Sequence, residues 1–359
     1  MSFTEIKRRE IKRYLLRKID EDDKALLPKI ADAFGISSTS VKRYIDAEIS
    51  EGHIRKDTGC SCGYTLVFSD KKQKYDLAGF TEREDALIYE DILPFLDVND
   101  RAKRIWRYVL PEMFNNALEH SEGSVVEAYV KKCCLYCEIT IVDNGVGIFR
   151  KVMDALKRFG YPDPLIEDAV IELYKGKFTS CPERHTGEGI FFSMKMMDRF
   201  AIISDGNILR SGYANSPSFE LSHLLDYAMK LTKTGTVVVM KLENDTERES
   251  REVFNLYADD DEGIVKTRIP VFEACLDRDP VARSQARRLC ARLSGFKEAE
   301  FDFVNVDMMG QGFADEVFRV YHNAHPEVKI TPINMNEDVH WMYKHAVNTK
   351  VEIPDYSDM

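Results

Sequence analysis

Apolar residues recur every three or four positions in three stretches near the start of the chain, a spacing that predicts three amphipathic helices. The second stretch ends at Gly35, where a helix commonly stops, and the third begins with hydroxyl side chains suited to capping. Two short apolar segments then predict a β-hairpin. These segments are 4–19, 26–34, 36–45, 52–56 and 63–67, so residues 1–69 should form a three-helix unit with a hairpin.

The pattern changes after residue 69. Residues 70–98 are largely polar and predict a linker that passes into a helix. Apolar strand patterns alternate with helical patterns over 99–245, which predicts helices packed on one face of a mixed sheet. Beyond a polar break, strands and helices alternate again over 262–348. The expected fold class is α+β, in three units.

Four polar motifs interrupt the apolar pattern of residues 99–245. Glu112 and Asn116 stand four apart in a predicted helix, so both side chains leave the same face. The Asn116 amide oxygen can bind Mg²⁺, and a carboxylate one turn earlier can orient a water or a hydroxyl. The other motifs are Asp143-Asn144-Gly145-Val146-Gly147-Ile148, Thr186-Gly187-Glu188-Gly189-Ile190 and Thr234-Gly235-Thr236.

The order of these four motifs resembles the GHKL ATPase family, which includes gyrase, histidine kinases and MutL, and within it the anti-sigma-factor serine kinases. The resemblance implies that the chain binds ATP and Mg²⁺. It assigns Asn116 to the metal and Glu112 to catalysis, as the residue that orients a water or a substrate hydroxyl. Asp143 would accept a hydrogen bond from the exocyclic amine of adenine, and Thr236 would place a hydroxyl near the base.

The glycines of the motifs have expected roles as well. Gly145 and Gly147, followed by Ile148, would let the backbone approach the adenine ring closely. The turn from Thr186 to Ile190 would present backbone N–H groups to phosphate where a helix begins. Phe191 and Phe192 depart from the family, in which smaller residues follow this turn. That departure bears on lid closure and hydrolysis more than on binding.

The long segment 150–185 separates the second motif from the third and is a candidate lid. Polar and basic residues that could reach phosphate gather near its end: Lys175, Lys177, Thr179, Ser180 and Arg184. His120, after the first motif, is also common in the anti-sigma kinases, although a helix-end histidine is the plainer interpretation.

The N-terminal unit resembles a winged helix-turn-helix. In that geometry the third helix meets the major groove and the hairpin forms the wing. The DNA-contacting residues would be Ser38, Thr39, Ser40, Lys42, Arg43, Arg55 and Lys56. A winged helix used for protein contacts is the alternative, since residues 1–58 hold 13 Lys and Arg against 11 Asp and Glu.

Residues 266–347 resemble STAS-like domains of unknown function, relatives of anti-anti-sigma factors. Those factors carry a phosphoacceptor Ser or Thr in the turn after the central strand. Here the turn reads Met308-Met309-Gly310-Gln311-Gly312, so no phosphoacceptor is expected in it. The resemblance implies a protein partner for this unit.

The composition of the chain excludes some classes of protein. The net charge of −11 argues against a nucleic-acid coat protein, and no apolar run approaches the length of a membrane span. A cytoplasmic protein with reduced cysteines is expected. Cys60 with Cys62, and Cys134 with Cys137, could be halves of a metal site, although no partners fall at zinc-finger spacing.

Three functions remain open from the sequence. The first is an ATPase regulator that engages DNA, the second a serine/threonine kinase acting on a partner, and the third a switch that binds ATP without hydrolysis. A sensor histidine kinase is disfavoured, because no dimerising helix with a phosphoacceptor histidine precedes Glu112. Homodimerisation is left open.

Overall fold

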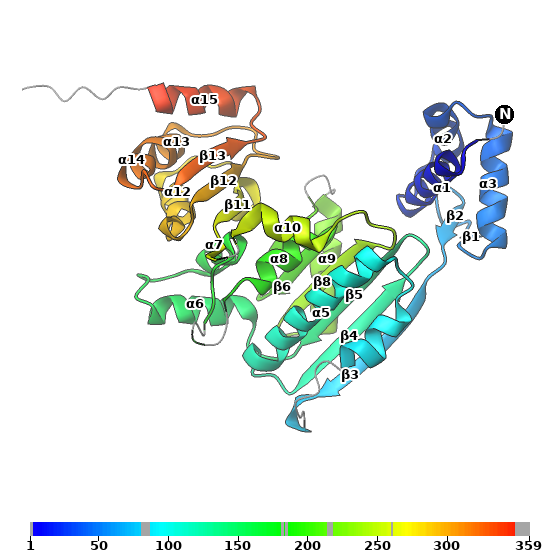
Figure 1. The fold of residues 1–359 in the computed structure, drawn as a ribbon, viewed down its shortest axis with the longest axis horizontal. Coiled ribbons are helices and arrows are strands. Elements are labelled where there is room, and N and C mark those ends of the chain that lie inside the picture. The colour runs from blue at the N-terminus through cyan, green and yellow to red at the C-terminus, as the bar shows by residue number, and fades with distance from the viewer. Residues whose placement is uncertain are drawn as a thin grey trace, which may run out of the picture.

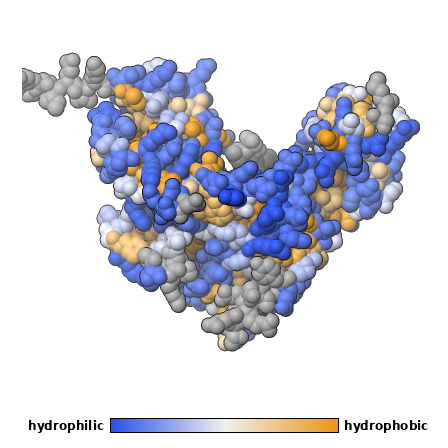
Figure 2. Space-filling model, in the orientation of Figure 1, coloured by the Kyte–Doolittle hydropathy of each residue, from blue (hydrophilic) through white to orange (hydrophobic). Residues whose placement is uncertain are grey.

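The computed structural model describes residues 3–79, 87–180, 183, 186–213, 218–259 and 261–348. The architecture is α+β, as predicted, and its largest element is a six-stranded sheet. The N-terminal helices stand at one end of this sheet and the C-terminal unit at the other (Figure 1). Figure 2 shows the wide notch between these two units.

The N-terminal unit consists of three helices and a two-stranded hairpin. Its elements are α1 (Glu5–Asp20), α2 (Leu26–Phe34), α3 (Ser38–Ser50), β1 (Ile54–Lys56) and β2 (Tyr64–Leu66). Gly35 ends α2 in the left-handed conformation, and the Ser37 hydroxyl accepts the Ser40 N–H to cap α3. The apolar faces of the helices close over one core, which also includes Leu135 from a turn of the central sheet.

The central sheet has the strand order β3-β4-β5-β8-β6-β7, and each neighbouring pair is antiparallel. The expectation of a mixed sheet is therefore wrong for these strands. Their bounds are β3 (Ser69–Asp76), β4 (Val125–Lys132), β5 (Tyr136–Asp143), β8 (Val237–Glu243), β6 (Arg199–Ser204) and β7 (Asn207–Ser211).

Strand β3 corrects the prediction of a linker over residues 70–98 for the part from residue 70 to residue 76. It pairs with β4 along its whole length, from Ser69 opposite Lys132 to Asp76 opposite Val125. Its sequence is polar because it is the edge of the sheet, where lysines discourage pairing with another chain. The short turns η2 (Leu87–Ile92) and η3 (Leu93–Phe95) follow the undescribed residues 80–86.

Both faces of the sheet carry helices, so the prediction of helices on one face holds only in part. One face is covered by α5 (Asp100–His120), α8 (Gly189–Met196) and α10 (Ser250–Tyr257). Trp106 and Phe114 of α5 are fully buried in this core. On the other face α9 (Ser218–Leu231) packs Ala228 against the sheet residues Ala201 and Val239. At one end lie α6 (Ile148–Arg158) and α7 (Ile166–Lys175).

The C-terminal unit is a small parallel sheet with the order β11-β12-β13, flanked by helices. A short hairpin of β9 (Ala258–Asp259) and β10 (Gly263–Ile264) leads into it. The remaining elements are β11 (Lys266–Pro270), α11 (Val271–Ala274), α12 (Arg283–Cys290), η4 (Leu293–Gly295), β12 (Glu298–Asp302), α13 (Gln311–Asp315), η5 (Glu316–Tyr321), α14 (His322–Ala324), β13 (Lys329–Ile333) and α15 (Glu337–Asn348). Phe301 and Phe313 are fully buried between them.

Candidate functional site

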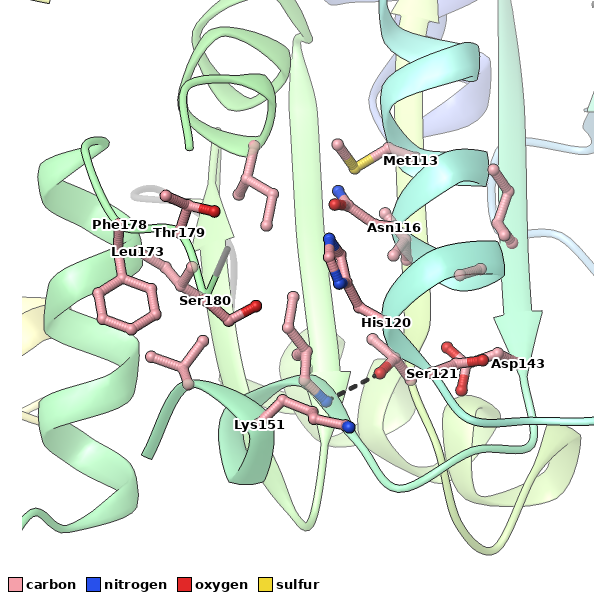
Figure 3. A pocket seen from close by; sticks show the side chains of 17 residues that line it. Met113, Asn116, His120, Ser121, Asp143, Lys151, Leu173, Phe178, Thr179 and Ser180 are labelled. Carbon is pink, nitrogen blue, oxygen red and sulfur yellow. Dashed lines mark hydrogen bonds between the residues drawn. The ribbon is translucent and has the colours of Figure 1, made fainter. Parts of the chain in front are cut away.

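A pocket lies where α5, α6 and the ends of β5 and β8 meet (Figure 3). Residues from all four polar motifs line it, namely Asn116, Asp143, Ile148, Ile190 and Thr236. The other lining residues are Met113, Ala117, His120, Ser121, Ile141, Lys151, Val152, Leu173, Phe178, Thr179, Ser180 and Val238. The space within it that water can fill is about 90 Å³.

Asp143 ends β5 at the wall of this pocket and is only 4% exposed. Its carboxylate accepts the Gly145 N–H at 2.9 Å and hydrogen bonds from Thr236. Burial nevertheless raises the pKa of Asp143, because removing a carboxylate from water costs more than these hydrogen bonds return. The side chain is therefore a buried acceptor held at a fixed angle.

Thr236, at the start of β8, joins two of the motifs. Its hydroxyl accepts the Ile148 N–H at 3.1 Å, the bond drawn dashed in Figure 3. That N–H belongs to the first turn of α6, which would otherwise lack a partner. The threonine thus ties the beginning of α6 to Asp143, across 93 positions of sequence from Asp143 to Thr236.

The two glycines of the second motif are required by packing. A Cβ on Gly145 would collide with the Ser121 carbonyl at the end of α5. Gly147 has φ +90°, and a Cβ there would collide with the Ser204 hydroxyl. Both glycines therefore let the chain turn tightly next to the pocket. This packing role comes in addition to the base-binding role that the sequence predicts for them.

Asn116 and His120 reach into the pocket from α5, and Figure 3 shows them opposite Thr179 and Ser180. Sequence reasoning gave His120 no role in the site. The signal that could have found it is the helical spacing of Met113, Asn116 and His120, which places all three on one face of α5.

Glu112 lies outside the residues that line the pocket. It packs beside Gly189, the first residue of α8, where any Cβ would collide with the Glu112 carboxylate. A carboxylate is favoured at that place, since the N-terminus of a helix carries partial positive charge. Glu112 shares a face of α5 with Asn116, as predicted, but it lies against the third motif and not among the residues that line the pocket.

Different residues of the turn from Thr186 to Ile190 contact the pocket and the C-terminal unit. Ile190 lines the pocket, Thr186 is exposed, and Gly187 has φ +77° and packs against the Phe178 carbonyl. Glu188 points elsewhere, because its carboxylate accepts the Ile264 N–H at 3.0 Å. Glu188 therefore anchors the chain that leads to the C-terminal unit.

Only some of the polar and basic residues predicted near the end of the candidate lid lie at the pocket. Thr179 and Ser180 line the pocket as expected, whereas Arg184 lies outside the described residues. The prediction that Lys175 and Lys177 contact phosphate is wrong for this structure. Their ammonium groups donate to backbone carbonyls of the C-terminal unit instead of reaching the pocket.

Phe191 and Phe192 are both buried and do not line the pocket. Phe191 packs edge-on against Tyr257, and Phe192 packs against Phe254. Their bulk, unusual after this turn, serves the contact between α8 and α10.

A family model described as the STAS-like domain of unknown function (DUF4325) matches residues 285–340. This segment begins within α12 and ends within α15, and it contains the parallel strand pair β12 and β13. Residues 285–340 form a STAS-like domain. The sequence prediction for this part of the chain is confirmed. A search of curated proteins found no match to the chain.

Helix α7, one wall of the pocket, is bound to the STAS-like domain. Lys175 is 1% exposed, and its ammonium donates to the carbonyl oxygens of Ala291 and Arg288 while it pairs with Glu172. Arg292 reaches back to Glu172 at 3.3 Å. The pocket wall and the STAS-like domain therefore share buried polar contacts.

Two further contacts extend this interface along α7. Arg288 lies 3.5 Å from the carboxylate of Asp168, and the Thr267 hydroxyl of β11 donates to the Lys175 carbonyl. Burial lowers the pKa of Lys175, although Glu172 acts in the opposite direction. The interface holds this ammonium with a carboxylate and two carbonyl oxygens, the partners that a buried charge requires.

The residues predicted to bind DNA gather on two elements of the N-terminal unit. Ser38, Thr39, Ser40, Lys42 and Arg43 belong to α3, and Arg55 and Lys56 to β1. All are exposed except Ser40, which is half-buried. Together they form a polar surface on the unit that no described element covers.

The cysteine pairs do not assemble a metal site among the residues that the structure describes. The Cys62 thiol donates to the Tyr64 carbonyl and the Cys137 thiol to Asn244. The group of ligand atoms close enough to hold an ion is that of Glu48, Glu51 and His53, and Lys12 already pairs with both glutamates. In the described part of the chain, every helix is too short or too polar to cross a membrane.

Proposed function

We propose that this chain is an ATP-binding regulatory protein of the GHKL type, and that the pocket between α5, α6 and β8 is its nucleotide site. The observation that carries the proposal is the convergence of four separate sequence motifs on one cavity. If the motifs had arisen by chance, Asn116, Asp143 and Thr236 would have no reason to line the same pocket. Each residue offers the chemistry that the resemblance assigns to it.

Adenine would be read at the deep end of the pocket. Asp143 is a buried acceptor, suited to the exocyclic amine, and the Thr236 hydroxyl fixes its orientation. The neighbouring Ile141, Ile148 and Val238 supply apolar surface for a flat ring. A buried carboxylate with a raised pKa is costly for folding, which favours a role in recognition.

The phosphates would lie toward α5 and the segment before residue 181. Asn116 offers one amide oxygen there, and this sparse donor set fits Mg²⁺, which keeps several waters and takes few protein ligands. When bound, the ion would neutralise phosphate charge. Thr179 and Ser180 on the opposite wall, with Lys151 of α6, can donate hydrogen bonds to phosphate oxygens.

The space open to water in the pocket, about 90 Å³, is less than the ~300–1,000 Å³ that ligand sites usually enclose. We therefore expect the pocket to widen when a nucleotide enters, with Phe178, Thr179 and α7 moving away from α5. Since Lys175 of α7 is bonded to Ala291, this movement must shift the STAS-like domain or break its contacts.

This linkage favours an ATP-gated switch over an ATPase with rapid turnover. Glu112 packs at the start of α8 and is not among the residues that line the cavity, so its carboxylate would have to shift before it could orient a water beside a bound phosphate. The STAS-like domain would offer different surfaces to a protein partner in the two states. The exposed polar surface of α3 and β1 favours DNA as the target of the N-terminal unit, which we assign as a winged helix.

Calorimetric titration with ATP and Mg²⁺ tests the proposal directly. The wild type should bind, and Asp143→Asn should lose most of its affinity. Asp57→Asn is the matched control, because Asp57 accepts the Gly59 N–H at 2.9 Å in the same turn geometry, far from the pocket. Equal affinity of Asp143→Asn and the wild type would refute the site.

The same preparation separates the three functions that the sequence leaves open. Incubation with γ-labelled ATP releases free phosphate if the protein hydrolyses ATP, and labels a protein if it transfers the phosphoryl group. A switch gives neither product at an appreciable rate while it still binds. Hydrogen exchange with and without ATP should then show altered protection in α7 and in residues 285–295.

A further inference from the structure

A second cavity of about 420 Å³ lies between the central sheet and the C-terminal unit. Its walls come from α8, β7 and α10 on one side and from β11, β12 and α11 on the other. Pro270 and Asp302 are the last residues of β11 and β12. The cavity thus opens at the carboxyl ends of parallel strands, the edge where α/β sheets commonly bind ligands.

Charged side chains are dense in this cavity. Four cationic residues line it, against three carboxylates. The cations are Lys195, Arg210, Arg248 and Arg268, and the carboxylates are Asp198, Glu273 and Asp302. Burial raises the pKa of Glu273, which further weakens the negative side of this balance.

Three of the cations have carboxylate partners. Arg210 forms two hydrogen bonds with Asp277, at 2.5 and 3.1 Å. Arg268 donates to Asp302 from Nε and from one terminal nitrogen. These paired arginines frame the cavity, and Arg248 lies 3.1 Å from the carboxylate of Asp198.

Two nitrogen donors of the cavity residues, on Arg210 and Lys195, lack an anionic partner among the described residues. Arg210 is only 7% exposed, and its Nε has no hydrogen-bond partner among the described residues. Lys195 makes no ion pair within the same part of the chain, and its one hydrogen bond runs to the Arg268 carbonyl at 3.3 Å. Its ammonium otherwise rests over the rings of Phe191 and Tyr257.

These donors are costly without a ligand. An unpaired donor in a buried guanidinium and an ammonium without a counter-ion both lose hydration that the protein does not replace. Burial and the nearby Arg268 lower the pKa of Lys195 to about 8, while Asp302 and Glu300 oppose this. An acceptor with negative charge would satisfy the Lys195 ammonium and would offset the charge of the Arg210 guanidinium.

We propose that this cavity binds a small organic anion, whose phosphate or carboxylate group is held by Lys195 and Arg210. Tyr257, Met194 and Pro270 line the same space and would cover the uncharged part of the ligand. The ligand would bridge α8 and β11, and so would fasten the C-terminal unit to the central sheet. The inference does not depend on ATP binding, because no residue of the nucleotide pocket lines this cavity.

Thermal unfolding of the full chain with inorganic phosphate, and separately with succinate, tests the proposal. One of the two anions should raise Tm in the millimolar range, and the anion that does so identifies the group recognised. Lys195→Met should weaken that binding about tenfold or more, through loss of a charge-assisted hydrogen bond. Sodium chloride at equal ionic strength controls for screening.

Lys132→Met is the matched control. Lys132 also donates to a backbone carbonyl and lies over an aromatic ring, in both cases of Phe95, but it stands on β4, far from the cavity. It should bind the anion as the wild type does. If Lys195→Met does not fold, Ser211→Asp on the cavity rim provides a second test, because its carboxylate would repel the anion.

The outcomes decide the proposal. An anion-dependent rise in Tm that Lys195→Met or Ser211→Asp removes, and that Asp143→Asn retains, supports it. A rise of the same size in the wild type, Lys195→Met and Ser211→Asp overturns it. The absence of any rise with either anion overturns it as well.

Discussion

The ammonium of Lys175 lies 2.5 Å from the carbonyl oxygen of Ala291 and 2.7 Å from the carboxylate of Glu172. The two oxygens belong to different units, one to the STAS-like domain and the other to α7. A single buried cation therefore holds a wall of the candidate nucleotide pocket against the C-terminal unit.

Replacing this lysine should loosen the joint. Lys175→Met keeps the apolar stem but leaves Glu172 and two carbonyls without their donor, so we expect a loss of about 3 kcal/mol of unfolding free energy. Urea unfolding monitored by tryptophan fluorescence measures it. Lys177→Met is the matched control, because this more exposed lysine also donates to a carbonyl of the C-terminal unit, and it should cost less than about 1 kcal/mol.

Asp143→Asn should cost little stability at neutral pH, although under the proposed function it should lose nucleotide binding. The substitution relieves the burial of a carboxylate while it weakens the hydrogen bonds from Gly145 and Thr236, and these effects nearly cancel. Urea unfolding near pH 7 should place the variant within about 1 kcal/mol of the wild type. A much larger loss would mean that Asp143 is mainly a structural residue.

The same variant has a predicted pH dependence. Because the pKa of Asp143 is raised, the folded protein holds this proton more tightly than the unfolded chain does. The stabilisation from Asp143 is then full below the usual aspartate range and is lost as the pH rises through the folded pKa. The wild type should gain stability relative to Asp143→Asn between about pH 7 and pH 4.5, as measured by urea midpoints.

Glu112→Ala should leave ATP affinity unchanged. If the wild type releases phosphate, the variant should release it about a hundredfold more slowly, because a residue that orients water acts on the barrier and not on binding. Glu119→Ala, an exposed position on the same helix, is the control. Phosphate release at the parental rate in Glu112→Ala would exclude a catalytic role.

The α3 surface should account for DNA binding. Fluorescence anisotropy with a genomic fragment pool at low salt should show binding by the wild type and none by Lys42→Glu combined with Arg43→Glu. Only a few cations face outward there, so the salt dependence should be shallow. Arg8→Glu with Arg9→Glu makes the same charge change on α1 and should bind normally. Absence of wild-type binding would assign this unit to protein contacts.

The sequence could predict residues whose role is carried by local chemistry. Asp143, Asn116 and Thr236 stand in short motifs with glycines or helical spacing, and the structure places them around the same pocket, although their roles there stay predictions. Lys175 was misassigned for a physical reason. A lysine near the end of a long connecting segment favours phosphate contact, but the two carbonyl oxygens that its ammonium binds lie more than 100 positions away in sequence.

Strand β3 shows a second limit. Lys71, Lys72 and Lys74 make its sequence read as a solvated linker, because hydropathy records exposure and an edge strand is exposed. The pairing with β4 that makes it a strand is a tertiary fact. The antiparallel sheet was missed for a similar reason, since strand direction depends on how distant segments pair.

The same edge strand fixes the position of the N-terminal unit relative to the central sheet. Only Val67 and Phe68 separate β2 from β3, so the chain between the two units is too short to act as a flexible tether. Arg13 and Arg17 of α1 also pair with Glu243 at the end of β8. If two chains associate, and if α3 binds DNA as proposed, the distance and angle between the two α3 helices would follow from the geometry of the sheets, and such an assembly would accept DNA half-sites at one spacing and reject others.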